Sequence, residues 1–229
     1  MIEALERHDL VWLEPGAYRR AHLAGAARLD LRAAQACLAD WLRRGHPLIV
    51  ARQGQDTPRG TLRLGLALPP REGKHRLAWH VATHTVRRAS APPLLGNIRR
   101  ALPLAWQDSI AALCEQPLPG ASAPRVIGSA ALAALTGEPC LNASSDLDLL
   151  VTVRHWRQAL DTAAALDALA QRRQRPRLDG ELRALDGTAV AWREVLRPVA
   201  QVLVKSRSAA QLLPWDRVQQ RWDAAAHCR

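Results

Sequence analysis

Residues 128–150 read GSAALAALTGEPCLNASSDLDLL, and this stretch decides the fold of the second half of the chain. Arg125 to Ile127 just before it are expected to form a short strand that ends at the Gly-Ser pair. Ala130 to Leu135 favour a helix, and Thr136 to Ser145 a polar loop. Asp146 to Val153 alternate acidic and apolar side chains and then become apolar, which predicts a second strand with one buried face.

Elements of both kinds continue downstream of this block. An apolar stripe predicts a helix over 155–173, and the Asp186-Gly187 dipeptide, typical of type I′ turns, predicts a hairpin of strands 177–185 and 188–196. A short strand at 201–204 and a last helix at 215–226 complete this half. We expect a mixed sheet with helices.

The first half alternates helical and strand patterns in the same way. One helix is expected at 31–44, three strands at 47–51, 61–68 and 76–86, and another helix at 97–116 that Pro103 bends or starts. Because 117–124 is rich in Pro and Gly, we place a domain boundary there, giving domains 1–118 and 119–229. The predicted fold class is α/β (α+β), with a smaller N-terminal α/β domain.

The acidic strand carries the first chemical signal. Side chains alternate along a strand, so Asp146 and Asp148 share one face and repel each other unless a cation neutralises them. Hard carboxylate oxygens at that spacing suit Mg²⁺. A third carboxylate is expected from the first hairpin strand, where Asp179 is the preferred catalytic and metal-binding residue and Glu181 the alternative.

The second signal is a phosphate site. A strand that ends in Gly128 and opens a helix leaves backbone N–H groups and the positive helix end free for a phosphate, and Ser129 adds a hydroxyl. Ser145 in the polar loop and Lys205 at the end of the 201–204 strand are further substrate-binding candidates. A phosphate-binding site beside metal-binding carboxylates is typical of enzymes that catalyse displacement at phosphorus.

Composition limits the environment and the partners. The 229 residues carry 32 Lys and Arg against 21 Asp and Glu, a formal charge of +11 that favours polyanionic partners. The four cysteines include no CxxC pair, and no apolar run approaches the ~18 residues of a membrane span. We expect a soluble cytoplasmic protein with reduced thiols that binds neither membrane nor nucleic acid.

The order of strand, Gly-Ser, helix, polar loop and DLDLL strand resembles the nucleotidyltransferase superfamily related to polymerase beta. A closer resemblance rests on RHDLVWL at 7–13, the block at 128–151 and LDGELRALDGTAVAWREVL at 178–196. In the first half it rests on PLIVARQ at 47–53 and LRLGLALPPREGKHRLAWHV at 62–81. Together these stretches resemble the malonate decarboxylase holo-acyl-carrier-protein synthases, also called phosphoribosyl-dephospho-CoA transferases.

The resemblance implies a reaction. Members of this family move 2′-(5″-phosphoribosyl)-3′-dephospho-CoA from its triphosphate precursor to a serine of the apo acyl carrier subunit of malonate decarboxylase and release diphosphate. Their two essential carboxylates correspond here to Asp146 and Asp148. The N-terminal domain is then expected to contribute to coenzyme or carrier binding.

Two other functions remain open at this point. A generic nucleotidyltransferase that moves NMP to a small molecule or a protein would keep the same site but bind an ordinary NTP. A non-catalytic basic module that binds RNA or DNA would explain the charge, but a metal-free pair of aspartates would repel a nucleic-acid backbone.

Overall fold

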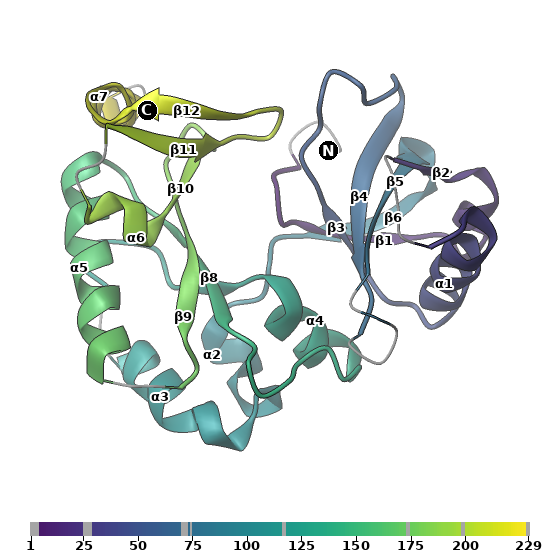
Figure 1. The fold of residues 1–229 in the computed structure, drawn as a ribbon, viewed down its shortest axis with the longest axis horizontal. Helices are drawn as coiled ribbons and strands as arrows, with labels where there is room; N and C mark the ends of the chain where they lie inside the picture. Colours follow the sequence, from purple (N-terminus) through teal and green to yellow (C-terminus); the bar gives the residue numbers. More distant parts are fainter. Residues whose placement is uncertain are drawn as a thin grey trace. The chain divides into compact units, whose positions relative to one another are not determined.

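The chain forms two compact units, shown in the computed structural model of Figure 1. The structure describes residues 5–24, 29–69, 73, 75–115, 118–172, 175–197 and 200–227. The first unit comprises Met1–Pro92 with Glu138–Cys140 and Arg207–Ala209, and the second comprises Pro93–Gly137, Leu141–Ser206 and Ala210–Arg229. Each unit contains a six-stranded sheet and helices, which confirms the α/β (α+β) class.

The units divide between Pro92 and Pro93, earlier than the expected boundary at 118/119. Pro103 does interrupt the expected helix: α2 (Leu95–Ile98) and the 3₁₀ turn η5 (Arg99–Ala101) precede it, and η6 (Leu104–Trp106) and α3 (Gln107–Glu115) follow it. Their apolar side chains pack into the core of the second unit, which is why the segment belongs there; they are Leu95, Ile98, Leu102, Trp106, Ile110 and Leu113. The described part of the Pro- and Gly-rich stretch, residues 118–124, is a loop inside that unit.

An antiparallel sheet with the order β2-β5-β4-β3-β1-β6 forms the first unit. Its elements are β1 (Leu10–Leu13), η2 (Pro15–Arg20), β2 (His22–Leu23), α1 (Leu31–Arg43), β3 (Leu48–Val50), β4 (Thr61–Ala67), β5 (Arg76–Ala82), η4 (Thr83–Thr85) and β6 (Val86–Ser90). The expected strand 76–86 is therefore two strands, separated by a 3₁₀ turn. Alternate residues of β4 are buried as their pattern predicts.

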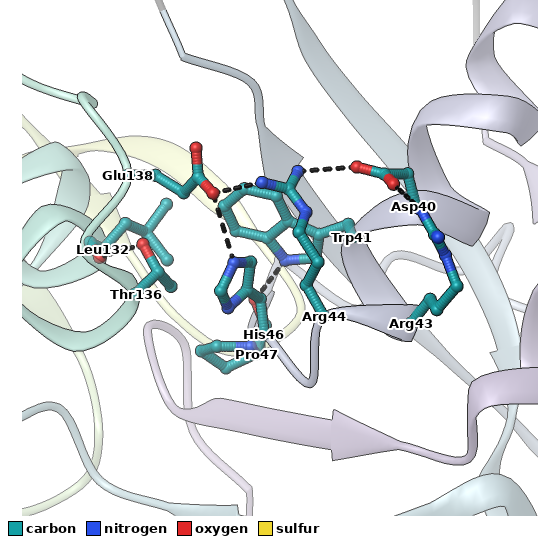
Figure 2. A network of polar contacts seen from close by, with 9 residues as sticks. All are labelled: Asp40, Trp41, Arg43, Arg44, His46, Pro47, Leu132, Thr136 and Glu138. Atoms are coloured by element: carbon teal, nitrogen blue, oxygen red, sulfur yellow. Dashed lines mark hydrogen bonds and ion pairs between the residues drawn. The ribbon is translucent and has the colours of Figure 1, made fainter.

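A polar network holds the end of α1 against residues Glu138–Cys140 within the first unit (Figure 2). Arg44 forms ion pairs with Asp40, at 2.8 Å, and with Glu138. The His46 Nε2 lies 3.4 Å from the same Glu138 carboxylate, and the Trp41 indole donates to the Pro47 carbonyl at 2.9 Å. Hydrogen bonds from Arg43 above all, and the charge of Arg44, lower the pKa of Asp40. Two carboxylates and two arginines thus neutralise one another at this helix end.

The second unit has the strand order β12-β11-β10-β9-β8-β7. Besides α2, η5, η6 and α3 it contains β7 (Arg125–Val126), α4 (Gly128–Thr136), β8 (Leu147–Thr152), α5 (Trp156–Arg172), β9 (Leu178–Arg183), β10 (Ala189–Ala191), α6 (Trp192–Val195), β11 (Gln201–Lys205), β12 (Ala210–Pro214) and α7 (Trp215–His227). β8 and β9 pair in parallel, and the other neighbours are antiparallel. The long helix α5 provides the crossover that a parallel pair requires.

Gly180 lets β8 and β9 approach each other. It lies opposite Leu149 in the parallel register and has a φ of 131°. A Cβ at this position would lie 1.9 Å from the Leu149 carbonyl oxygen, a clash with backbone that no side-chain movement relieves. Glycine is therefore a steric requirement of the parallel pair.

The predicted hairpin forms, but its second strand ends at Ala191, where α6 follows instead of a strand to residue 196, and its turn is of a different type. Ala184 and Thr188 close a three-residue loop through an N–H···O bond of 2.8 Å, and only Gly187 of the Asp186-Gly187 pair adopts a positive φ, of 81°. A type I′ turn needs positive φ at both positions, so this is the three-residue loop with a left-handed last residue.

The last helix, α7, is fastened to this hairpin. The Arg221 Nε donates to Asp186 at 2.6 Å, and the fully buried Trp222 indole donates to the Thr188 hydroxyl at 3.0 Å. Burial opposes ionisation of Asp186, but hydrogen bonds from Thr188 and Arg221 outweigh it and lower the pKa of this carboxyl. The ionised Asp186 therefore stabilises the folded chain.

Cys37, Cys114 and Cys140 are not joined in disulfides, and Cys228 lies outside the described residues. Among the described helices, none has both the length and the apolar character that crossing a bilayer would take.

Gly180→Ala should lower the free energy of unfolding by about 2–4 kcal/mol, because the new methyl group meets the β8 backbone at a positive φ. Denaturant unfolding measures this. Gly96→Ala is the control, since a Cβ there meets nothing within 4 Å, and equal stabilities of the two variants would contradict the steric requirement.

Asp186→Asn should cost about 1 kcal/mol at pH 7, a modest value because Arg221 is partly exposed. The pKa of Asp186 lies below the value of about 3.9 for an unfolded Asp, so the difference from wild type should persist above pH ~4 and vanish as the pH falls through the folded value. Unfolding measured from pH 7 to 3 checks this. The exposed Asp161→Asn is the control, and a difference that grows in acid would refute the assignment.

Candidate active site

Parallel pairing brings the acidic residues of two strands together. Asp148 on β8 lies directly opposite Asp179 on β9, and Leu150 lies opposite Glu181. Because paired residues share a face, Asp148, Asp179 and Glu181 project from one side of the sheet, while Leu147, Leu149 and Leu178 project into the core on the other. The structure thus places the expected third carboxylate, Asp179, beside the acidic strand.

Gly128 and the start of α4 lie against Asp148. Gly128 has a φ of +67°, and a Cβ there would lie 2.6 Å from the Asp148 Oδ2. The Ile127 amide donates to the Asp148 carbonyl at 3.0 Å, and Ile127, as N-cap of α4, gives the helix no side-chain cap. Gly128 and Ser129 therefore place an uncapped helix N-terminus next to the Asp148 carboxylate. A phosphate at this position could accept hydrogen bonds from the N–H groups of the helix and also bind a cation held by Asp148.

Asp146 lies directly before β8 and is bound to an arginine. The Arg177 Nε donates to its Oδ1 at 2.9 Å and Nη2 to its Oδ2 at 2.6 Å, and Arg177 Nη2 also lies 3.7 Å from the Asp179 Oδ2. The hydrogen bonds from Arg177 lower the pKa of Asp146 against the opposing effect of burial. The same bonds raise the pKa of Arg177. Asp146 is therefore ionised and fully engaged by one guanidinium.

Arg177 is the site residue that the sequence analysis missed. Its signal was present, because Arg177-Leu178-Asp179 repeats the spacing of Asp146-Leu147-Asp148. Arg177 lies directly before β9 as Asp146 lies before β8, and the Leu147 amide donates to the Arg177 carbonyl at 2.9 Å. Only the register between the strands shows that the two triplets face each other.

Glu181, the alternative third carboxylate, is bound to Lys205. Lys205 Nζ lies 2.8 Å from the Glu181 Oε1, and the Glu181 side chain is only 8% exposed. In the strand register Lys205 pairs with Ala189, and Ala189 pairs with Arg183. Arg183 alternates with Glu181 and Asp179 along β9, so the Lys205 side chain projects from the same face of the sheet as these carboxylates. The bond to Glu181 uses one of the three donors of the ammonium group, and the others remain for a phosphate.

Ser145 closes the turn that leads into the acidic strand. Its hydroxyl accepts from the Asn142 amide at 2.9 Å and lies 3.2 Å from the Asn142 Oδ1. Asn142 also caps the Ser144 amide at 2.9 Å. The Ser145 hydroxyl is therefore engaged in the loop, and a contact with substrate stays a prediction.

The donor set suits Mg²⁺ in chemistry, because Asp146, Asp148 and Asp179 all offer hard carboxylate oxygens. Their arrangement does not: over the described ranges of the chain, no three His, Cys, Asp or Glu side chains are grouped so as to hold a metal ion. The guanidinium of Arg177 lies between Asp146 and Asp179 instead.

Family models match both units. One, described as the phosphoribosyl-dephospho-CoA transferase MdcG N-terminal domain, covers residues 6–92, and the corresponding C-terminal domain covers residues 94–216. The gap between the two matches coincides with the structural boundary at 92/93. No solved structure matches the chain.

Several curated proteins named phosphoribosyl-dephospho-CoA transferase are similar over nearly the full length. The protein of Xanthomonas axonopodis pv. citri is 42% identical over 211 residues, which are 91% of this chain and 93% of the relative. The protein of Bradyrhizobium diazoefficiens is 37% identical over 90% of this chain and 89% of the relative. The protein of Klebsiella pneumoniae is 32% identical over 92% of this chain and 96% of the relative. These matches confirm the resemblance found in the sequence, and the chain belongs to the phosphoribosyl-dephospho-CoA transferase family.

Proposed function

We propose that this transferase moves 2′-(5″-phosphoribosyl)-3′-dephospho-CoA from its triphosphate precursor to a serine of the apo acyl carrier subunit of malonate decarboxylase, with release of diphosphate. Membership in the phosphoribosyl-dephospho-CoA transferase family supports the identity of the transferred group. The observation that carries the chemistry is the pairing of Asp148 with Asp179 beside the N-terminus of α4.

The proposed reaction is a nucleotidyl transfer. The serine hydroxyl of the carrier attacks the α-phosphorus of the triphosphate, the bond from this phosphorus to the diphosphate oxygen breaks, and diphosphate leaves. Asp179 takes the serine proton; its Oδ1 accepts from the Gly180 amide at 2.8 Å, which fixes the carboxylate on the open face of the sheet.

The groups around the carboxylates are proposed to bind the triphosphate. The N–H groups of the first turn of α4, at Gly128 and Ser129, are proposed to hold the departing diphosphate, and Lys205 a further phosphate oxygen. Mg²⁺ held by Asp146, Asp148 and Asp179 would supply neutralisation of the phosphate oxygens. Gly128 keeps this space open, because any side chain there would meet Asp148.

An acidic carrier protein would suit the basic chain. The formal charge of +11 favours encounter with an anionic partner as well as with a triphosphate. The role of the first unit in coenzyme or carrier binding stays a prediction.

Asp146→Asn and Asp148→Asn should each abolish transfer while leaving the fold intact, because either change removes an ionised carboxylate from the proposed metal site. The measurement is the intact mass of the apo carrier subunit after incubation with the protein, Mg²⁺ and the triphosphate precursor; wild type should add the mass of the prosthetic group. The partly exposed Asp167→Asn, on α5, is the matched control. Full activity in either site variant would refute the assignment, and an unmodified carrier that a reference enzyme does modify would refute the reaction.

Asp179→Asn should lower the rate of transfer at least ~100-fold, the low end for loss of a general base. Glu181→Gln should cost much less, because an amide oxygen can still accept from Lys205 at the position of Oε1. Single-turnover rates of transfer by the two variants show which of the two carboxylates the reaction depends on. The opposite ranking would make Glu181 the third acidic residue of the reaction.

A further inference from the structure

Arg177 lies where three acidic side chains converge. Its guanidinium makes two hydrogen bonds to Asp146, at 2.6 and 2.9 Å, and lies 3.7 Å from Asp179. Asp148 is the register partner of Asp179 and projects from the same face of the sheet. Arg177 therefore offsets one of the negative charges of the carboxylate cluster, defined here as Asp146, Asp148 and Asp179.

The pair combines a fixed backbone with a movable side chain. The Leu147 amide bonds to the Arg177 carbonyl, so strand pairing holds residues 146 and 177 side by side. The Arg177 side chain is nevertheless 65% exposed, and solvent surrounds most of it. The guanidinium can leave Asp146 without any change in the sheet.

Arginine and a metal ion compete for Asp146. Arg177 donates to both carboxylate oxygens, so a cation bound through a remaining lone pair would lie within a few ångströms of the guanidinium charge and be repelled by it. Over the described residues, no three His, Cys, Asp or Glu side chains are grouped so as to hold a metal ion. The donor set suits a divalent cation, but its arrangement does not, and Asp146 binds Arg177 instead.

We propose that Arg177 is the resident counter-ion of the carboxylate cluster, and that a divalent cation binds only by displacing it from Asp146. This proposal rests on the metal site of the proposed function and adds its regulation. Competition with the arginine weakens binding of the free cation. The cation then enters most favourably together with the triphosphate, whose negative charge also attracts the released guanidinium.

The test is binding of Mn²⁺, a paramagnetic substitute for Mg²⁺, to the substrate-free protein, followed by the electron paramagnetic resonance signal of the unbound ion. In Arg177→Gln the dissociation constant should fall at least about tenfold, because a unit charge a few ångströms from the site is removed. Arg177→Lys keeps a charge but loses the bidentate contact, so its affinity should lie between those of wild type and Arg177→Gln.

Arg157→Gln is the matched control, since it removes the same charge from an exposed ion pair with Asp161 on α5. Its Mn²⁺ affinity should stay within about twofold of wild type. Thermal unfolding of each variant shows that the fold is retained, and Arg177→Lys keeps the test decisive if the glutamine variant does not fold.

The outcomes separate the two proposals. Equal Mn²⁺ affinity of wild type and the Arg177 variants, with binding lost in Asp148→Asn, would overturn the counter-ion role and leave the metal site standing. Binding that is absent from every variant, or unaffected by Asp148→Asn, would overturn the metal site and the counter-ion role together.

Discussion

Parallel pairing of β8 with β9 is the contact on which the candidate site depends. It sets Asp148 beside Asp179 and Asp146 beside Arg177, and it requires glycine at position 180 because the Leu149 backbone fills the space of any Cβ. The crossover helix α5 connects the two strands and covers the core face. The opposite face carries Asp148, Asp179 and Glu181 together with the buried Leu150, so one steric condition in the backbone determines where these carboxylates lie.

Charge on that face is organised as cation–carboxylate pairs. Arg177 pairs with Asp146 and lies 3.7 Å from Asp179, and Lys205 pairs with the nearly buried Glu181. A carboxylate as buried as Glu181 would be costly without its partner, whereas Asp146 meets an arginine that is largely in solvent. The two pairs therefore differ in kind: the Lys205 pair is a fixed part of the sheet, and the Arg177 pair can open.

Local sequence was sufficient for most elements of the second unit, but it missed α6 (Trp192–Val195), where a strand was expected, and β12 (Ala210–Pro214). Short-range signals predicted several of the elements: the alternation in DLDLL, the Gly-Ser pair and the Asp-Gly dipeptide. The turn type was not predicted, because it depends on the φ of a single residue, Asp186. The boundary near 92/93 was missed because a Pro- and Gly-rich loop inside a unit looks like a linker. Arg177 and the partner of Glu181 follow from strand register, which no local pattern specifies.

The C-terminal helix α7 runs past residue 216, where the family match ends, and yet Val218 and Trp222 are fully buried in the same core as β8 and β9. Through Thr188 and Asp186 this helix also supports the hairpin whose first strand carries Asp179. Loss of the inner side chains of α7 would therefore loosen the support of the candidate site from outside it. The sheet that carries the site owes part of its rigidity to a segment that lies beyond the family match.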